Sequence, residues 1–230
     1  MERGLYIAAS GMMSEMVRQD LIANDLANAS TPGYKPDRAT QREFAELLLA
    51  NSSSGAPVGA LGMGVAIDRR VTDLSPAAIR DTGEATDFAI EGDGFFAVRT
   101  DGGVRYTRNG QFSVSATGAL VDSLGHQVLG PTGRPLAVAA DGKIESAALG
   151  VFSLDGARKE GDSLLTGTAR GKAAGTVRQG ALEASGTDPV RAMVEMIASL
   201  RALEANQRVI TTIDGTLTRA ATQVASPNGG

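Results

Sequence analysis

The stretch TDPVRAMVEMIASLRALEANQRVITTIDGTLTRAATQV, residues 187–224, holds the most regular pattern in the chain. Apolar residues recur in it at intervals of seven, in the series Met196, Leu203, Ile210, Leu217 and Val224. A sustained repeat of this kind is typical of a long helix with a coiled-coil type of seam. Thr187 or Asp188 as the N-cap, with Pro189 at the first helical position, predicts where this helix begins.

The N-terminal stretch predicts a second helix, over residues 4–30. Its apolar stripe recurs at steps of three, four or seven, through Leu5, Ala9, Met12, Met16, Ala23 and Leu26. Asn24 and Asn28 lie beside this stripe, one turn apart. They either face solvent or form hydrogen bonds between helices or subunits, because a buried amide costs stability unless it is paired. Pro32 and Gly33 favour a type II turn that ends the helix.

Between residues 65 and 165 the chain changes to short strand-like pieces. Segments such as GFFAVRT and VRYTRNG alternate with glycine-containing turns such as TDGG. Many short strands separated by such turns predict a compact, mostly antiparallel β domain. Most of the aromatic residues fall in this part of the chain and are expected to form its core, because each ring buries a large area: Phe88, Phe95, Phe96, Tyr106 and Phe112.

These patterns predict an α+β fold in which the terminal helices pair as a coiled-coil-like stalk and bracket the β domain. A further short helix is expected over residues 37–50 and a loop over 51–64, and residues 155–180 are interpreted as a loop-rich return path. The expected domains are a terminal helical assembly domain made of residues 1–35 and 181–230, a connecting segment over 36–64, the central β domain over 65–165, and a return linker over 166–180.

The composition narrows the possible functions. The chain has no cysteine, which excludes disulfides, thiol nucleophiles and thiolate metal sites. A net charge of -4 and the absence of a dense basic block argue against binding to nucleic acid. No apolar run approaches the roughly 18 residues of a membrane span. The N-terminus is interpreted as mature helix rather than signal peptide, because Glu15, Arg18 and Asp20 follow on a helical period.

No group of residues in the sequence predicts catalysis. His126 is the single histidine, and no Gly-x-Ser-x-Gly turn occurs. The paired glycines of GALGMG and EGDGFF lack the residues that a phosphate-binding loop needs, so they are interpreted as tight turns. Glu91 and Asp93 alternate in such a turn and are left unassigned. We therefore expect no enzyme, cofactor, metal or small-molecule substrate; the alternative is an enzyme with an unrecognised site in the β domain.

Several stretches read together resemble the bacterial flagellar rod and hook axial proteins. They are GLYIAASGM and DLIANDLANASTPGYK near the N-terminus, TDFAIEGDGFFAV and YTRNGQFSVSATGALVDSLGHQVLG in the middle, and QGALEASGTDPVRAMVEMIASLRALEANQRVITTIDGTL near the C-terminus. The chain length is most similar to that of the two-domain rod subunits, of the proximal type, with the distal rod and related hook-basal-body proteins as alternatives. Two positions depart from the family pattern: Gly186, where Asn is usual, and Leu203, where Tyr is common.

The resemblance implies a structural subunit of a helical tube that transmits torque from the motor. Its terminal helices would line the inside of the tube and its β domain the outside. It further implies partners among other copies and other rod and hook subunits, export by the flagellar type III apparatus without a cleaved signal, and a location in the basal body that spans the periplasm if the cell is Gram-negative. The expected assembly residues are Leu5, Met12, Met16, Asn24, Leu26, Asn28, Met196, Leu203, Ile210, Leu217 and Val224.

Overall fold

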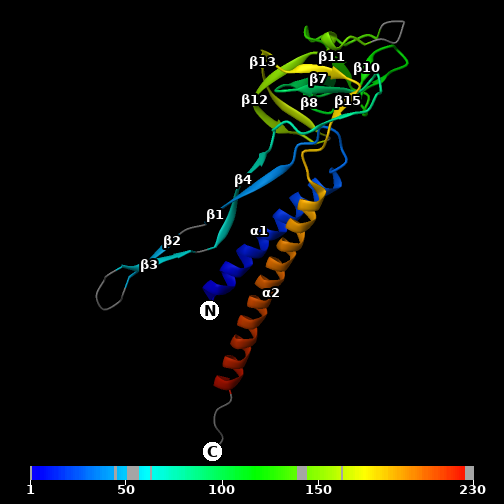
Figure 1. The fold of residues 1–230 in the computed structure, drawn as a ribbon. Helices are drawn as coiled ribbons and strands as arrows, with labels where there is room; N and C mark the ends of the chain where they lie inside the picture. Colours follow the sequence, from blue (N-terminus) through cyan, green and yellow to red (C-terminus); the bar gives the residue numbers. More distant parts are fainter. Residues whose placement is uncertain are drawn as a thin grey trace, which may run out of the picture. The chain divides into compact units, whose positions relative to one another are not determined.

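The computed structural model describes residues 2–43, 46–50, 57–62, 64–138, 144–161 and 163–225 (Figure 1). Side chains are described outside residues 2–3, 41, 43, 46–50, 57–62 and 223–225. The chain folds as two compact units. The first contains residues 1–26, 37–71 and 189–230, and the second contains residues 27–36 and 72–188.

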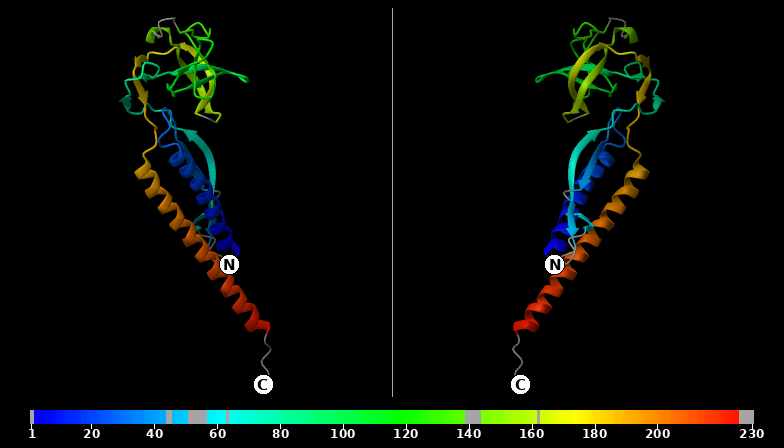
Figure 2. Two further views of the ribbon diagram at one scale, coloured as in Figure 1. Left: turned by 90° about the vertical axis from the view of Figure 1, so that its right-hand side faces the viewer. Right: turned by 90° about the vertical axis from the view of Figure 1, so that its left-hand side faces the viewer.

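Two long helices dominate the first unit. They are α1 (Glu2–Ala27) and α2 (Pro189–Ala225), of 26 and 37 residues. Both views in Figure 2, like Figure 1, show them side by side with opposite chain directions. The predicted terminal helices are therefore confirmed, and α2 begins at the proline expected to be its first residue. Neither helix, over its described residues, combines the length and hydropathy that a bilayer span requires.

The first unit also contains two strand pairs. One joins β1 (Asp37–Glu43) to β4 (Val65–Thr72), and the other joins β2 (Glu46–Ala50) to β3 (Pro57–Gly62) in antiparallel register. The helix predicted over residues 37–50 is therefore wrong. The β-branched residues of β4 favour a strand, and pairing with β4 and β3 satisfies the backbone amides and carbonyls of β1 and β2 in place of a helix. The loop expected over 51–64 is wrong at β3; residues 51–56 and 63 lie outside the described residues.

Four strands of the second unit form a closed ring of antiparallel pairings. They are β7 (Phe95–Thr100), β8 (Gly103–Thr107), β13 (Leu164–Lys172) and β12 (Val151–Lys159), and β12 returns to pair with β7. The sheet continues from β7 through β11 (Gln127–Leu129), β10 (Leu120–Val121) and β9 (Ser113–Val114). A 3-10 turn, η1 (Ser146–Ala148), precedes β12. This barrel confirms the predicted antiparallel β domain.

Two smaller antiparallel pairs complete the second unit. β5 (Ile79–Asp81) pairs with β15 (Ala181–Glu183), and β6 (Phe88–Glu91) pairs with β14 (Thr176–Gln179). Because β12, β13 and β14 all fall between residues 151 and 179, the loop-rich interpretation of residues 155–180 is wrong. Most of β13 is exposed, so its sequence lacks the apolar alternation that marks a strand with one face in the core.

The core of the second unit consists of two buried clusters, and alternate residues of β7 contribute to one or the other. All five aromatic residues predicted for it are buried, with Phe88 and Phe96 fully inaccessible to solvent. The rings of Phe96 and Phe112 meet edge to face, with centroids 5.3 Å apart, an arrangement that adds to the stabilisation from buried area. The expected aromatic core is therefore confirmed.

Candidate assembly surface and the buried charged cluster

Small or polar residues take part in each of the contacts described here between α1 and α2. A Cβ atom added at Gly11 would lie 3.0 Å from the Asn206 amide, and one at Gly4 would lie 3.2 Å from the Ile213 side chain. Next along the helices, the Ser199 hydroxyl donates a 2.6 Å hydrogen bond to the Glu15 carboxylate. The three α2 positions are spaced by seven residues, so they form one row along the helix.

The predicted assembly residues lie mainly beside this contact. On α1, Leu5 and Met16 are exposed, while Met12 and Leu26 are half-buried. On α2, Met196, Leu203 and Ile210 are half-buried and Leu217 is exposed, and the side chain of Val224 lies outside the described residues. Asn24 is exposed. Asn28 is half-buried and accepts a 3.2 Å hydrogen bond from the Thr31 hydroxyl, so its amide oxygen stabilises the turn after α1.

Sequence reasoning missed the small residues that bring the helices together. Gly4, Gly11 and Ser199 carry no hydrophobic signal, so a search for apolar periodicity passes over them. The spacing of Gly4, Ala8 and Gly11 was the available signal, because small residues three and four apart let a second helix approach closely. Ala8 is buried in the structure, as that signal indicates.

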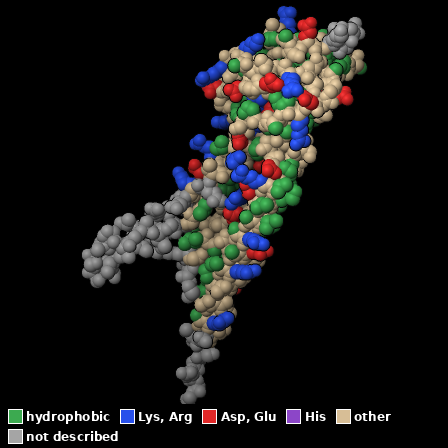
Figure 3. Space-filling view, in the orientation of Figure 1, with side chains coloured by type: hydrophobic (Ala, Val, Ile, Leu, Met, Phe, Trp, Pro, Cys, Tyr) green, Lys and Arg blue, Asp and Glu red, His purple; other side chains and the backbone are tan. Residues whose placement is uncertain are grey.

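Both helices leave large apolar side chains exposed. Along the N-terminal half of α2, five such residues have exposed fractions between 46% and 68%: Val190, Met193, Val194, Ile197 and Leu200. Figure 3 shows hydrophobic side chains gathered along this part of α2. On α1, Tyr6, Met13 and Met16 are more than half exposed. Apolar surface that is continuous along a helix marks a site of protein interaction.

The second unit contains a buried cluster of charges made by Lys35, Arg108 and Glu183. The Lys35 ammonium lies 2.5 Å from one carboxylate oxygen of Glu183, and the Arg108 guanidinium lies 2.9 Å from the other. All three side chains are at most 3% exposed. The Ala77 amide also donates to Glu183, at 2.9 Å. Buried charges are retained only when they are paired and hydrogen-bonded, as they are here.

The segments around this cluster pass close to one another. Gly33 has the positive φ of 65° that a type II turn requires at its position, which confirms the turn predicted at Pro32 and Gly33. The Gly33 amide donates to the Glu183 carbonyl, and the Gly186 amide donates to the Tyr34 carbonyl, both at 2.9 Å. A Cβ atom on residue 186 would lie 2.8 Å from Pro36, so the glycine that departs from the family pattern permits close packing there.

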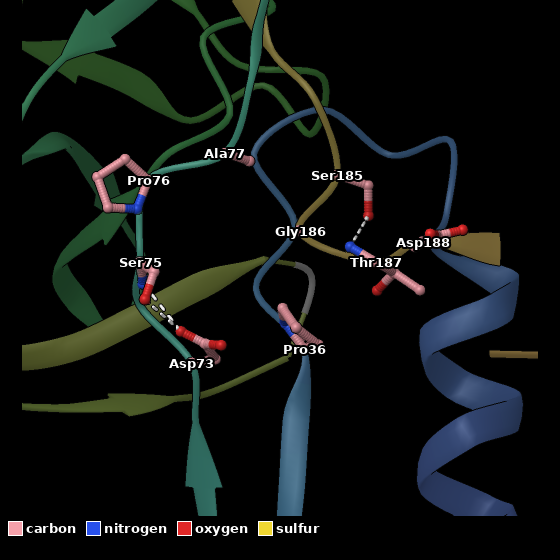
Figure 4. Close-up of a pocket in the computed structure, with 9 residues that line it drawn as sticks. All are labelled: Pro36, Asp73, Ser75, Pro76, Ala77, Ser185, Gly186, Thr187 and Asp188. Atoms are coloured by element: carbon pink, nitrogen blue, oxygen red, sulfur yellow. Dashed lines mark hydrogen bonds between the residues drawn. The ribbon is translucent and has the colours of Figure 1, made fainter. Parts of the chain in front are cut away.

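A small pocket adjoins these segments (Figure 4). It has a volume of about 260 Å³ and is lined by Pro36, Asp73, Ser75, Pro76, Ala77, Ser185, Gly186, Thr187 and Asp188. The Ser75 amide and hydroxyl donate to Asp73, and the Thr187 amide donates to the Ser185 hydroxyl. These hydrogen bonds order the two loops that form its walls.

The residues considered for catalysis have structural contacts. The His126 ring lies 2.9 Å from Asp122, whose carboxylate also accepts the backbone amides of Leu124 and His126 in the turn between β10 and β11. Glu91 forms an ion pair with Arg178. Within the described part of the chain, His, Cys, Asp and Glu side chains do not gather into a group of three or more that could hold a metal.

Three family descriptions match the chain in sequence order. Residues 5–35 match "Flagella basal body rod protein", residues 89–153 match "Flagellar hook protein FlgE/F/G D1 domain", and residues 178–223 match "Flagellar basal body rod FlgEFG protein C-terminal". The chain is 31% identical to the flagellar basal-body rod protein FlgG of Bacillus subtilis (strain 168), with 93% of the chain and 96% of the relative covered. The chain belongs to the flagellar basal-body rod protein family.

Rod proteins named FlgF match the chain as well as FlgG. The rod protein FlgF of Rhizobium meliloti (strain 1021) is 30% identical, and that of Escherichia coli (strain K12) is 32% identical; in both cases 96% of this chain and 97% of the relative are covered. The resemblance recognised from the sequence motifs is therefore confirmed. In this rod protein, each of the three matched segments contributes one residue to the buried cluster: Lys35, Arg108 and Glu183.

Proposed function

We propose that this rod protein polymerises into the axial tube of the flagellar basal body through the outer faces of α1 and α2. The observation that carries the proposal is the exposed apolar surface on both helices, which includes Met13 on α1 and Ile197 on α2. Burial of such surface is favourable by about 25 cal/mol per Å². A repeated head-to-tail contact that does not close on itself generates a filament.

Within the subunit, the two helices pair in coiled-coil fashion. Ser199, Asn206 and Ile213 each lie three residues after a member of the predicted row, which is the series Met196, Leu203, Ile210, Leu217 and Val224. Three residues is the a-to-d spacing of a heptad. The remaining apolar residues of that heptad stay available to neighbouring subunits. The proposed assembly residues are Leu5, Met12, Met16, Asn24, Leu26, Asn28, Met196, Leu203, Ile210, Leu217 and Val224.

The family match supports further proposals about the environment of the subunit. Its partners are other copies and other rod and hook subunits, and it reaches the basal body through the flagellar export apparatus without a cleaved signal. The basal body in which it lies spans the periplasm if the cell is Gram-negative. The stretch NASTPGYK and the compact size of the chain favour a rod subunit of the proximal type, with the distal rod and related hook-basal-body proteins as alternatives.

A matched pair of substitutions tests the assembly proposal. Ile197→Asp places a charge on the exposed face of α2, and Val114→Asp places one on an exposed apolar position of the second unit. In cells that lack the native copy, we expect Ile197→Asp to abolish motility and incorporation into basal bodies, and Val114→Asp to preserve both. Incorporation of Ile197→Asp at the native level would contradict the proposed surface.

A further inference from the structure

The charges of the buried cluster are unequal in number. Lys35 and Arg108 are two cations, and in the described part of the chain Glu183 is the ion-pair partner of both. Carbonyl oxygens add to the solvation of both cations, while the Nε of Arg108 is buried without a hydrogen-bond partner in the described part of the chain. Ser75 accepts from Lys35 at 2.6 Å, and Ile90 and Gly92 accept from Arg108 at 3.3 and 2.7 Å. One carboxylate therefore neutralises part of the charge of two cations that have almost no access to water.

The three residues come from different parts of the second unit. Lys35 lies in the segment 31–36, which follows α1, and Glu183 ends β15, which precedes α2 along the chain. We call the segments 31–36 and 181–187 the two straps. Backbone hydrogen bonds join the straps at Glu183 itself and three residues later: the Gly33 amide donates to the Glu183 carbonyl, and the Gly186 amide donates to the Tyr34 carbonyl.

Arg108, in contrast, is held by the barrel and by β6. It follows β8 directly, and its guanidinium donates to carbonyls at the end of β6 and in the turn after it. Its guanidinium carbon lies 5.2 Å from the centroid of the Phe95 ring, at the start of β7, where a cation–π interaction holds it. These contacts are independent of the straps, so the barrel presents a fixed buried cation to Glu183.

We propose that Lys35, Glu183 and Arg108 form an ionic clasp that fastens both straps to the barrel. Without the Glu183 carboxylate, two buried cations would have no counterion, and the least costly response is for the straps to detach and admit water. The barrel core consists of other residues, such as Phe96, Val98 and Val128, and stays folded. Because the straps continue into α1 and α2, tension on either helix reaches the clasp before the barrel strands.

Hydrogen exchange on the full chain tests the clasp. We expect Glu183→Gln to accelerate exchange of strap amides on the order of 100-fold or more, because breaking a buried ion pair from one side is strongly destabilising. Amides of β7, β8 and β12 should exchange as in the native chain. Glu160→Gln is the matched control, since Glu160 pairs with Arg105 at the surface and is half exposed, where such pairs contribute little.

Because both cations share the Glu183 carboxylate, we expect Lys35→Met and Glu183→Gln to accelerate exchange of the strap amides by different amounts. Lys35→Met leaves the neutral Glu183–Arg108 pair, so its strap amides should exchange at least 10-fold more slowly than those of Glu183→Gln. The double variant Lys35→Met/Glu183→Gln retains one uncompensated cation instead of two, and should exchange more slowly than Glu183→Gln alone. Equal acceleration in Lys35→Met and Glu183→Gln, loss of barrel protection together with the straps, or unchanged strap exchange would each overturn the clasp.

Force measurements give a second readout. The chain has no native cysteine, so cysteines introduced at Ala27 and Val190, which are both exposed, allow tension to be applied across the straps. The native chain should open at a higher force than Glu183→Gln, and the Glu160→Gln control should match the native chain. Equal opening forces in all three proteins would contradict a mechanical role.

Discussion

The hydroxyl of Ser199 on α2 donates a 2.6 Å hydrogen bond to the carboxylate of Glu15 on α1, and Ser199 is almost completely buried. A carboxylate enclosed between two helices is stable only when it is paired. Arg18, at 4.0 Å, is its other partner. Sliding one helix by a turn would separate Glu15 from its donor, so this pair favours one alignment of α1 against α2.

Ser199→Ala should therefore destabilise the helix pair. The substitution leaves the Glu15 carboxylate without its hydroxyl donor, which costs about 1–3 kcal/mol despite the higher helix propensity of alanine. Thr218→Ala is the matched control, because Thr218 is exposed and its hydroxyl bonds only to the backbone of its own helix, at Asp214. Urea unfolding followed by far-UV circular dichroism measures both. Equal midpoints for the two variants would contradict a role for the Ser199–Glu15 pair.

Gly11→Leu should separate the helices. Because a Cβ atom at this position would already lie 3.0 Å from the Asn206 amide, a larger side chain forces the helix axes apart, and overpacking of this kind costs about 1–3 kcal/mol. Gly215→Leu is the control on α2, where a Cβ atom would meet nothing within 4 Å. It should leave stability unchanged or raise it by up to about 1 kcal/mol, from helix propensity alone. Thermal unfolding that ranks the two variants in the opposite order would refute the close approach at Gly11.

The helices and the aromatic core could be predicted because both have a periodic apolar signal. The row from Met196 to Leu217 located α2, and the aromatic residues located the barrel. The same signal failed at the helix contact, because Gly11 and Ser199 are small and the large apolar residues beside them remain exposed. It also failed for β13, whose side chains are mostly in solvent.

The charged cluster could not be predicted from spacing. Lys35 and Glu183 are separated by 148 positions along the chain, and each taken alone resembles an ordinary surface charge. Only the pairing of β5 with β15, and the turn at Pro32 and Gly33, bring them together. The turn was predicted from its residues, whereas the strand pairing depends on the fold of the whole unit.

Ile210→Asp should block assembly while the second unit stays folded. Ile210 is half-buried in the predicted row of α2, and a carboxylate there would lose hydration on contact with a neighbouring subunit. Thr211→Asp, at the exposed adjacent position, is the control and should assemble. Incorporation into basal bodies measures both variants, and hydrogen exchange of the β7 and β8 amides checks that the second unit is folded. Normal incorporation of Ile210→Asp would refute the role of this row.

Gly33→Ala should destabilise the second unit far more than a comparable substitution elsewhere. A Cβ atom at Gly33 would come within 2.4 Å of three backbone atoms of Arg108 and Asn109. Backbone cannot give way as a flexible side chain can, so the turn must move, and the Gly33–Glu183 hydrogen bond and the neighbouring Lys35 move with it. We expect a loss of at least about 3 kcal/mol in the free energy of unfolding.

Gly83→Ala is the control for Gly33→Ala, because it separates the steric clash of the added Cβ atom from the cost of a positive φ. Gly83 also has a positive φ, of 77°, but a Cβ atom there would meet nothing within 4 Å. Its substitution should cost only the roughly 1–2 kcal/mol of a left-handed conformation. Urea unfolding of both full-length variants, followed by tyrosine circular dichroism because the chain has no tryptophan, gives the comparison. Similar losses in the two variants would mean that the straps tolerate displacement at Gly33, and that their close packing against Arg108 contributes little to stability.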